Sequence, residues 1–504
     1  MAQKKFVIVG GGTAGWMAAA SLARLFSANP ASCHEVVLVE SEEIGTVGVG
    51  EATIPTILDL LSFLKIDLAE FVRDTNATMK LAIKFRDWRH RGHAYWHPFG
   101  TLGPTVENRP LFNYWLAREQ TGKTGIGLMD LSIAVQLAEN GHFAFPEDDP
   151  RSPLGGLRYA LHFDATEVAR FLRDYAEKHG ARRVEGRVVD ARLRSESEIR
   201  ELRLSDGRIL GGDFFIDCSG FRALLIERAL GSPFEDWSAW LPCDCAFAAP
   251  TASEAILKPY TTSTALSSGW KWEIPLQTRK GNGYVFSSRF QSHEEALGEF
   301  RQSLSSEPLS DPRLLRFTAG MRREIWRGNC LSLGLSSGFL EPLESTSIHL
   351  VFINLFRFLD HFPSSGLDPQ LIARFNTLAA IEMEEIRDFL VLHYCLTDRE
   401  DSEFWRYMRR LPLPDSLAAK IELFRNTGRL MARHEDLFTP ISWISVMHGM
   451  GLNPEETDPL VDLVPAQYID NVMWHLAKGY RSAAQSAPQH AEFLARAGFL
   501  GSPQ

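Results

Sequence analysis

The chain has 504 residues, of which 45% are hydrophobic, 23% charged and 11% aromatic, and its 53 Lys and Arg against 63 Asp and Glu give a formal net charge of −10. This composition is that of a globular protein and excludes a disordered, collagenous or low-complexity chain. The acidic balance argues against a nucleic-acid partner, which requires a basic surface. The length allows roughly two to four domains.

The first apolar stretch, residues 6–23, follows two lysines as the apolar part of a signal peptide would. Glycines at positions 10, 11, 12 and 15 interrupt it, so a strand, a turn and a helix explain the pattern better. No other uncharged run approaches the roughly 20 residues that a membrane span requires. We therefore expect a soluble, cytoplasmic protein with no membrane partner.

A β-α-β unit with a glycine-rich first turn is predicted at this point. The segment 10–15 reads G-x-G-x-x-G between the apolar run 6–9 and the Ala- and Leu-rich run 16–26. In such a turn the first glycine permits the bend, the second admits a pyrophosphate and the third lets the helix pack on the strand. Glu40 ends the next apolar run and can hold a ribose hydroxyl. The pattern predicts a dinucleotide site for NAD or FAD.

A second nucleotide contact is predicted at Ile216-Asp-Cys-Ser-Gly220, which follows a strand late in the chain. This arrangement resembles flavoproteins of the glutathione-reductase class, whose nucleotide domain is interrupted by a substrate domain, and it favours FAD. The predicted fold is therefore α/β: a Rossmann-type FAD domain with an antiparallel sheet and a mainly helical C-terminal cap over the substrate.

The rest of the chain separates into sheet and helix regions. Residues 261–290 alternate polar and apolar side chains, which is typical of an antiparallel sheet. From residue 348 onward the spacing is mainly helical. We expect an FAD-binding module over 1–350, with loop insertions near 97–156, and a helical substrate-binding part over 351–504. The six cysteines are scattered without metal-binding spacing, so we expect free thiols and no metal site.

Three further segments have two interpretations each. Lys80 and Lys84 are four apart and would point the same way in a strand or a helix, but on this segment alone a solvated edge strand is the favoured interpretation. Trp270 and Trp272 would form an aromatic wall on one strand face, or part of an ordinary core. Residues 338–350 run into a helix whose free N–H groups could hold a small anion, or which is simply capped.

Taken together, these segments resemble the flavin-dependent halogenases of the tryptophan-halogenase type. The resemblance covers nearly the whole chain, through GGGTAGW, GVGEATIP, KLAIKF, YALHFDA, FIDCSGFRALLI, GWKWEIPLQ and SGFLEPLESTSIHL. It implies that reduced FAD, supplied by a separate flavin reductase, reacts with O2 and a halide, chloride or bromide. The hypohalous acid formed then travels through an internal tunnel to a lysine beside the aromatic substrate. A homodimer is also suggested by the resemblance.

The resemblance implies a role for each matching position. Lys80 is the lysine that localises electrophilic halogen, Glu344 polarises the halogen donor or takes the ring proton, and Ser345 relays between lysine and flavin. Thr346 and Ser347 provide backbone N–H groups for the halide. The residues expected to hold the cofactor are Gly10, Gly12, Thr13, Ala14, Gly15, Glu40, Gly50, Ala52, Asp217 and Gly220.

The expected substrate residues are His97, Phe99 and Trp443 around the aromatic ring, with Trp270 and Trp272 as the wall between flavin and substrate. No match to the Tyr and Glu residues that fix the amino and carboxylate groups of free tryptophan is found. The sequence therefore predicts a small, indole-like aromatic substrate, with a larger or peptide-linked one as an alternative. An FAD-dependent aromatic monooxygenase and a non-catalytic FAD-fold binding protein are the competing functions.

Overall fold

The computed structural model describes residues 3–28, 34–43, 50–122, 124–362, 366–433 and 436–500. They form two compact units, each built from three stretches of chain: 1–77, 163–244 and 315–384 in the first, and 78–162, 245–314 and 385–504 in the second. The expected division into an FAD-binding module over residues 1–350 and a helical substrate-binding part over residues 351–504 stays a prediction.

The first unit is built on a six-stranded sheet with the order β10-β2-β1-β14-β23-β22, parallel except at β22. β1 (Lys5–Val9) and β2 (Glu35–Glu40) are mostly buried apolar runs, as expected for strands covered on both faces. Val9 is in register with Val39 on one side and Asp217 on the other. The carboxyl ends of these strands therefore meet at one edge, where open parallel sheets bind nucleotides.

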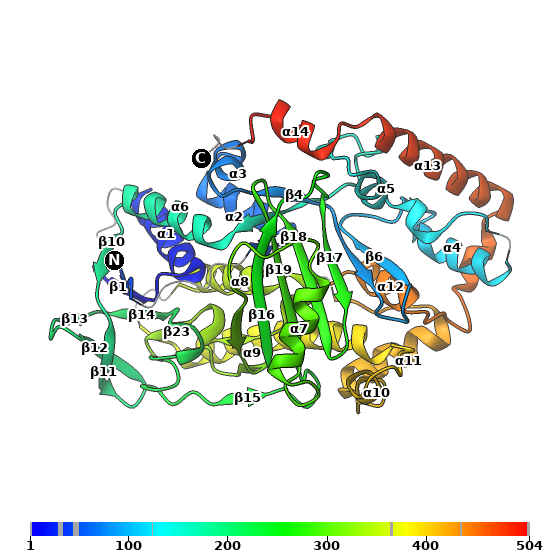
Figure 1. Cartoon of the computed structure of the whole chain (residues 1–504). Coiled ribbons are helices and arrows are strands. Elements are labelled where there is room, and N and C mark those ends of the chain that lie inside the picture. Colours follow the sequence, from blue (N-terminus) through cyan, green and yellow to red (C-terminus); the bar gives the residue numbers. More distant parts are fainter. Residues whose placement is uncertain are drawn as a thin grey trace. The chain divides into compact units, whose positions relative to one another are not determined.

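Helices α1 and α6 pack together in this unit and lie side by side in the picture (Figure 1). The predicted β-α-β unit and α/β class are confirmed. The unit's further elements are α1 (Thr13–Ser27), β3 (Gly50–Ala52), α2 (Ile57–Leu64), α3 (Leu68–Asp74), α6 (Ala165–Lys178), β10 (Arg182–Glu185), β11 (Val188–Ser195), β12 (Glu198–Leu204), β13 (Ile209–Gly211), β14 (Phe214–Asp217), η2 (Gly220–Arg222), β15 (Phe234–Asp236), β21 (Gly320–Arg322), β22 (Trp326–Arg327), β23 (Cys330–Ser332), η3 (Gly334–Ser336), β24 (Gly338–Phe339), η4 (Pro342–Glu344) and α8 (Ser347–Asp360).

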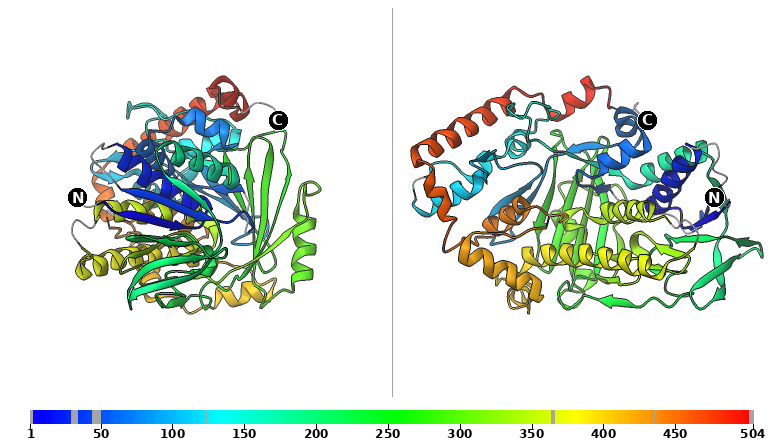
Figure 2. Two further views of the ribbon diagram at one scale, coloured as in Figure 1. Left: turned by 90° about the vertical axis from the view of Figure 1, so that its left-hand side faces the viewer. Right: turned by 180° about the vertical axis from the view of Figure 1, so that it is seen from behind.

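The second unit is built on a seven-stranded sheet with the order β20-β16-β19-β18-β17-β5-β6. The neighbouring strands β16, β19, β18 and β17 pair antiparallel, which confirms the antiparallel sheet predicted over 261–290. By contrast, β17 and β5 pair parallel. Helix α7 covers one face of these strands through Phe300, which packs with Phe247 and Phe286. Figure 2 (left) shows this green helix alongside the green strands.

Helices follow the sheet in the last stretch of this unit, as the helical spacing predicted. The elements are β4 (Thr78–Lys80), β5 (Ala82–Arg86), β6 (Ala94–Pro98), β7 (Thr105–Val106), β8 (Arg109–Pro110), α4 (Leu111–Gln120), η1 (Leu128–Leu131), α5 (Ile133–Asn140), β16 (Cys245–Ala252), β17 (Tyr260–Ala265), β18 (Gly269–Pro275), β19 (Arg279–Phe286), α7 (His293–Ser303), α10 (Glu403–Arg409), α11 (Asp415–Thr427), α12 (Pro440–Gly449), η5 (Pro459–Leu463), α13 (Ala466–Ser486) and α14 (His490–Arg496). β9 (Ala160–Asp164), β20 (Arg313–Arg316) and α9 (Pro369–Cys395) contribute residues to both units. Within the described ranges, every helix is too short or too polar to traverse a bilayer.

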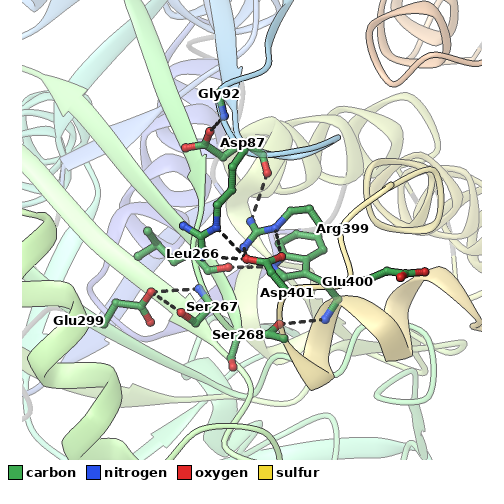
Figure 3. A network of polar contacts seen from close by, with 12 residues as sticks. Asp87, Gly92, Leu266, Ser267, Ser268, Glu299, Arg399, Glu400 and Asp401 are labelled. Carbon is green, nitrogen blue, oxygen red and sulfur yellow. Dashed lines mark hydrogen bonds and ion pairs between the residues drawn. The ribbon is translucent and has the colours of Figure 1, made fainter.

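A buried arginine ties the helical stretch of the second unit to its sheet (Figure 3). Arg399 is 3% exposed, donates two hydrogen bonds to Asp401 at 2.8 and 2.9 Å, and a third to the carbonyl oxygen of Asp87 at 3.1 Å. Its guanidinium also lies 4.5 Å from the ring centroid of Trp405, which donates to the carbonyl oxygen of Leu266. One cation thus holds the β5–β6 turn against α10.

We expect Arg399→Ala to lower the free energy of unfolding by about 3 kcal/mol, because it removes three hydrogen bonds made by a charged group and the packing of a buried side chain on the Trp405 ring. Arg409→Ala is the control, since that arginine is 44% exposed and pairs with Glu400 at the surface. Its cost should stay below about 0.5 kcal/mol. Denaturant titration measures both values, and equal losses would contradict the role given to Arg399.

Candidate functional site

Three glycines shape the turn between β1 and α1, each for its own steric reason. A Cβ on Gly10, whose φ is +115°, would lie 2.1 Å from the carbonyl oxygen of Cys218. A Cβ on Gly15 would lie 1.9 Å from the carbonyl oxygen of Gly10. Around Gly12, by contrast, a Cβ would meet no described atom within 4 Å. The turn is therefore tight on its protein side and open at Gly12, which fits a pyrophosphate approaching the backbone.

Thr13 and Ala14 begin α1, and the hydroxyl of Thr13 lies 3.5 Å from the carbonyl oxygen of Ala165. The first N–H groups of a helix have no intrahelical acceptor and attract anions. No acidic residue stands in the first turn of α1, so nothing there opposes a phosphate. Thr13 and Ala14 are thus positioned to bind a diphosphate through their backbone.

Glu40 lies beside this turn, because a Cβ on Gly11 would meet its Oε2 atom at 1.4 Å. Its other oxygen accepts a hydrogen bond from Nε of Arg183 at 2.5 Å. Arg183 also pairs with Glu42 and Glu185, and the hydrogen bond to Glu40, followed by the contributions of Glu42 and Glu185, raises the pKa of its guanidinium. One carboxylate oxygen of Glu40 thus points at the glycine turn while Arg183 orients the group, an arrangement compatible with binding a ribose hydroxyl.

The carboxylate of Asp217 organises its own loop. Its Oδ1 accepts from the N–H and hydroxyl of Ser219, and its Oδ2 accepts from the N–H groups of Leu225 and Ile226, all between 2.6 and 2.9 Å. With four hydrogen bonds already made, the side chain shapes the loop that presents Gly220, which has a φ of +71° and open space where a Cβ would lie. A cofactor contact here would come from the backbone of that loop.

Gly50 and Ala52 are described at the start and end of β3, whereas residues 44–49 of the glycine-rich segment lie outside the described residues. Between them stands Glu51, which the sequence analysis did not single out. Burial and the negative charge of Asp164 raise the pKa of Glu51 to about 7. Its position inside GVGEATIP, between two residues expected to hold the cofactor, was the signal that could have singled it out.

A left-handed residue separates two helices where a halide site was expected. η4 ends at Glu344, which is 1% exposed, and Ser345 follows with a φ of +62°. For a serine this conformation costs about 1 kcal/mol or more. Thr346 is the N-cap of α8, without a side-chain capping bond, and Ser347 is its first residue. The turn therefore presents the first N–H groups of a 14-residue helix beside a buried carboxylate.

A hydrogen-bonded chain supports this turn within the first unit. His349, on α8, contacts the hydroxyl of Thr56 through Nδ1 and Glu382 Oε1 through Nε2, both at 3.0 Å. Arg357 pairs with the other oxygen of Glu382 at 2.9 Å. These contacts join the segment after β3 to α8, so the expected flavin loop and the expected halide turn share one buried support.

Lys80 and Lys84 do not belong to one strand. The chain leaves the sheet of β4 at Lys80 and enters the seven-stranded sheet at Ala82, which corrects the expectation of a shared face. Lys80 is fully buried, with Nζ 5.1 Å from the ring centroid of Phe99, so it is no part of a solvated edge strand. Lys84 is half-buried over Trp96, 4.6 Å from that centroid, and burial lowers its pKa.

Two uncharged histidines hold the strand of Lys80. Thr78 donates to the carbonyl oxygen of Pro275 at 2.6 Å, so its hydroxyl accepts from Nδ1 of His162 at 3.0 Å. His490 accepts the N–H of Met79 at Nε2, at 3.1 Å, so its Nδ1 carries the proton. Burial lowers the pKa of His490 to about 3, and burial with the charge of Lys80 lowers that of His162.

Trp270 and Trp272 lie on one face of β18, with ring centroids 6.1 Å apart and planes tilted by 56°. They are 1% and 7% exposed. The indole of Trp272 lies where a side chain on Gly283 of the neighbouring strand would be, since a Cβ there would approach its ring to 2.0 Å. The predicted pair thus forms a continuous aromatic surface on the sheet.

His97 and Trp443 belong to one aromatic cluster, which we call the ring cluster: His97, Phe389, Phe438 and Trp443. Phe389 stacks on Phe438 with centroids 3.8 Å apart, and it lies 5.5 Å from His97 and 4.9 Å from Trp443. Sequence analysis missed both phenylalanines, because aromatic side chains at helical spacing look like ordinary core. Phe99, whose ring lies against the ammonium of Lys80, follows His97 by two residues in the chain.

Two glycine variants separate folding from cofactor binding. Gly12→Ala should leave the melting temperature unchanged, because its Cβ has room, yet weaken FAD binding at least tenfold by obstructing the pyrophosphate. Gly15→Ala should lower the melting temperature by several degrees, because its Cβ collides with the Gly10 carbonyl. Differential scanning calorimetry and flavin-fluorescence titration measure the two properties. Unchanged FAD affinity in Gly12→Ala would contradict the assigned cofactor turn.

Comparison with known proteins identifies the family. The chain matches the family model for tryptophan halogenase over residues 5–466. It is 36% identical to tryptophan 7-halogenase RebH of Lentzea aerocolonigenes, with 97% of this chain and 98% of that protein covered. The solved structures of the flavin-dependent halogenases Xcc4156 from Xanthomonas campestris and BrvH from Brevundimonas sp. BAL3 match with TM-scores of 0.94 and 0.93 at 42% and 41% identity, each over 99% of both chains. The chain therefore belongs to the tryptophan halogenase family of flavin-dependent enzymes.

Proposed function

We propose that this enzyme halogenates an electron-rich, indole-like aromatic at Lys80. The observation that carries the proposal is the complete burial of that lysine against Phe99, on a strand held by two uncharged histidines. Full burial is uncommon for a lysine, and it places this amine directly against an aromatic ring. Its ammonium can hydrogen-bond hypohalous acid or form a haloamine, and either keeps electrophilic halogen in place for the ring.

Family members are enzymes that use FADH2 with O2 and a halide, and the reduced flavin comes from a separate reductase. We assign cofactor binding to the glycine turn, Thr13, Ala14, Glu40, the residues of β3 and the loop at Gly220, on the fit described above. When bound, reduced flavin would activate O2 into the two-electron oxidant that converts halide to hypohalous acid. The N–H groups of Thr346 and Ser347 would hold the halide.

Transfer of halogen from hypohalous acid to the ring needs no further oxidant or reductant. A carbon of the aromatic ring attacks the halogen of hypohalous acid, so a carbon–halogen bond forms while the oxygen–halogen bond breaks. The ring then loses its proton, and water is the second product. We assign Glu344, which is buried, to general-base or polarising chemistry, and Ser345 to a relay beside it.

The substrate class follows from the ring cluster rather than from the relatives' names. RebH is a tryptophan 7-halogenase, but the aromatic side chains of this chain fit any flat, electron-rich ring. Trp270 and Trp272 are assigned to the wall that keeps substrate from flavin. Neither the monooxygenase nor the non-catalytic alternative is favoured, because the whole-chain relatives are halogenases. A homodimer and a cytoplasmic location stay predictions.

A direct assay tests the activity. Protein, a flavin reductase, FAD and NADH are incubated in air with indole or tryptophan, each with chloride or bromide, and mass spectrometry detects the halogen isotope pattern. We expect halogenated indole. Hydroxylated product in its place would support the monooxygenase alternative, and halogenated tryptophan would show that the chain fixes an amino-acid group after all.

Lys80→Ala should abolish halogenated product, by at least a factor of about 10³, while reduced flavin is still oxidised at its own rate. Lys84→Ala is the matched control, because that lysine lies over Trp96 in a different sheet. Its product yield should stay within about twofold of the parent. The assignment fails if Lys84→Ala loses the product and Lys80→Ala keeps it.

Glu344→Gln keeps the size of the side chain and removes its basicity. Turnover should fall by about 10²–10⁴, the usual contribution of a positioned acid–base group. The FAD dissociation constant should change less than threefold, which flavin-fluorescence titration checks. Full turnover in this variant would remove Glu344 from the mechanism.

A further inference from the structure

The strand that ends at Lys80 is held from one side by a histidine of the last helix. β4 is the last strand of its sheet and pairs with β9, where Met79 is in register with Leu161. The N–H of Met79 donates to Nε2 of His490, on α14, at 3.1 Å. Buried backbone N–H groups are almost always hydrogen-bonded in native proteins. The imidazole thus supplies the acceptor that a further strand would otherwise provide.

His490 is itself fixed in place, because contacts on several sides hold the start of α14. Its Nδ1 donates to the carbonyl oxygen of Leu257 at 3.2 Å, and its backbone N–H donates to the carbonyl oxygen of Gly141 at 2.9 Å. Its ring lies 5.9 Å from that of Phe143, which also packs on Phe493 of α14 with centroids 4.7 Å apart. The fully buried imidazole is therefore a rigid link between α14 and β4.

The link reaches the backbone one residue before Lys80. Thr78, whose side chain shares a strand face with that of Lys80, has its own support, since it contacts His162 at 3.0 Å and the carbonyl oxygen of Pro275 at 2.6 Å. β4 is thus held by a side chain at Thr78 and by its main chain at Met79. Removing the second support leaves the first, so we expect the strand to stay folded while the lysine loses its fixed position.

We propose that His490 is a positioning residue for halogen transfer, which acts by fixing Lys80 through the N–H of Met79. The proposal rests on the proposed halogenase function, because it requires that Lys80 holds the electrophilic halogen. A displacement of about 1 Å at a reacting group can lower its rate by about 100-fold. The last helix of the chain therefore governs how much hypohalous acid reaches the aromatic ring and how much escapes into water.

The partition of halogen between two acceptors tests the proposal in the full-length enzyme. The assay contains FAD, a flavin reductase, NADH, bromide and indole, together with a soluble 1,3-diketone that traps escaped hypohalous acid, because its activated C–H bond is replaced by a C–halogen bond with release of water. Mass spectrometry measures both halogenated products, and the consumption of reduced flavin is followed in parallel. The melting temperature of each variant is measured as well.

His490→Phe keeps an aromatic ring beside Phe143 and removes the acceptor. Halogenated indole should fall at least about tenfold, because Lys80 is displaced, while halogenated diketone rises. Consumption of reduced flavin should stay within about twofold, since the halide site is assigned to the other unit. His490→Gln restores an acceptor at nearly the same place, and should return halogenated indole to within about threefold of the unmodified enzyme.

His142→Phe is the matched control. Its imidazole contacts the carbonyl oxygen of Ala484 at 2.7 Å and the side chain of Gln489 at 2.8 Å, so it supports the same end of the chain through groups outside β4. The ratio of halogenated indole to halogenated diketone should change less than about twofold in this variant.

The proposal is overturned if His490→Phe keeps its halogenated indole, if both products fall together in a variant of unchanged melting temperature, or if His490→Gln recovers no product. Should His490→Phe not fold, Phe493→Leu decides, because it loosens α14 on Phe143 and leaves His490 in the chain. An unchanged ratio of the two products in that variant overturns the proposal. An unmodified enzyme that halogenates neither indole nor the diketone would overturn the proposed function instead.

Discussion

The close approach of backbone to backbone at the carboxyl edge of the parallel sheet is the constraint on which the first unit depends. Gly10 faces the Cys218 carbonyl, and Gly15 faces the carbonyl of Gly10, at distances where no Cβ fits. This packing aligns Val9 with Val39 and Asp217, so that the glycine turn and the Asp217 loop come to one edge. The same contacts leave Gly12 open beside the first N–H groups of α1, which is why we assign the cofactor to this edge.

The second unit buries an amine on a strand that is held by neutral side chains. Lys80 has no exposed surface, and the two imidazoles that hold its strand are neutral. Protonating either one would place a second cation beside the lysine in a medium where water cannot screen it. The same unit packs His97, Phe389 and Trp443 into the ring cluster.

The cofactor residues and the lysine belong to different compact units, and both units are assembled from three separate stretches of chain. This interleaving explains why the motifs that carry the resemblance to the family are scattered through the sequence. Oxidation of halide and transfer of halogen to carbon are chemically separate steps, and a reactive lysine can serve the second without contacting the flavin. Burial of both Glu344 and Lys80 suits such chemistry, because water competes with the substrate for hypohalous acid.

The sequence by itself determined the β-α-β unit, the antiparallel strands and the helical last stretch, because these follow from local periodicity and turn residues. It also located the glycine turn, Lys80 and Glu344 through motifs. Only the tertiary structure decided that Lys80 and Lys84 occupy different sheets, since a break at Leu81 leaves no mark on the pattern. Tertiary contacts likewise decided that the carboxylate of Asp217 accepts hydrogen bonds from its own loop. They also decided that Phe389, Phe438, Glu385 and His490 contact residues far away in the chain. Such contacts depend on which surfaces meet, and local spacing carries no information about that.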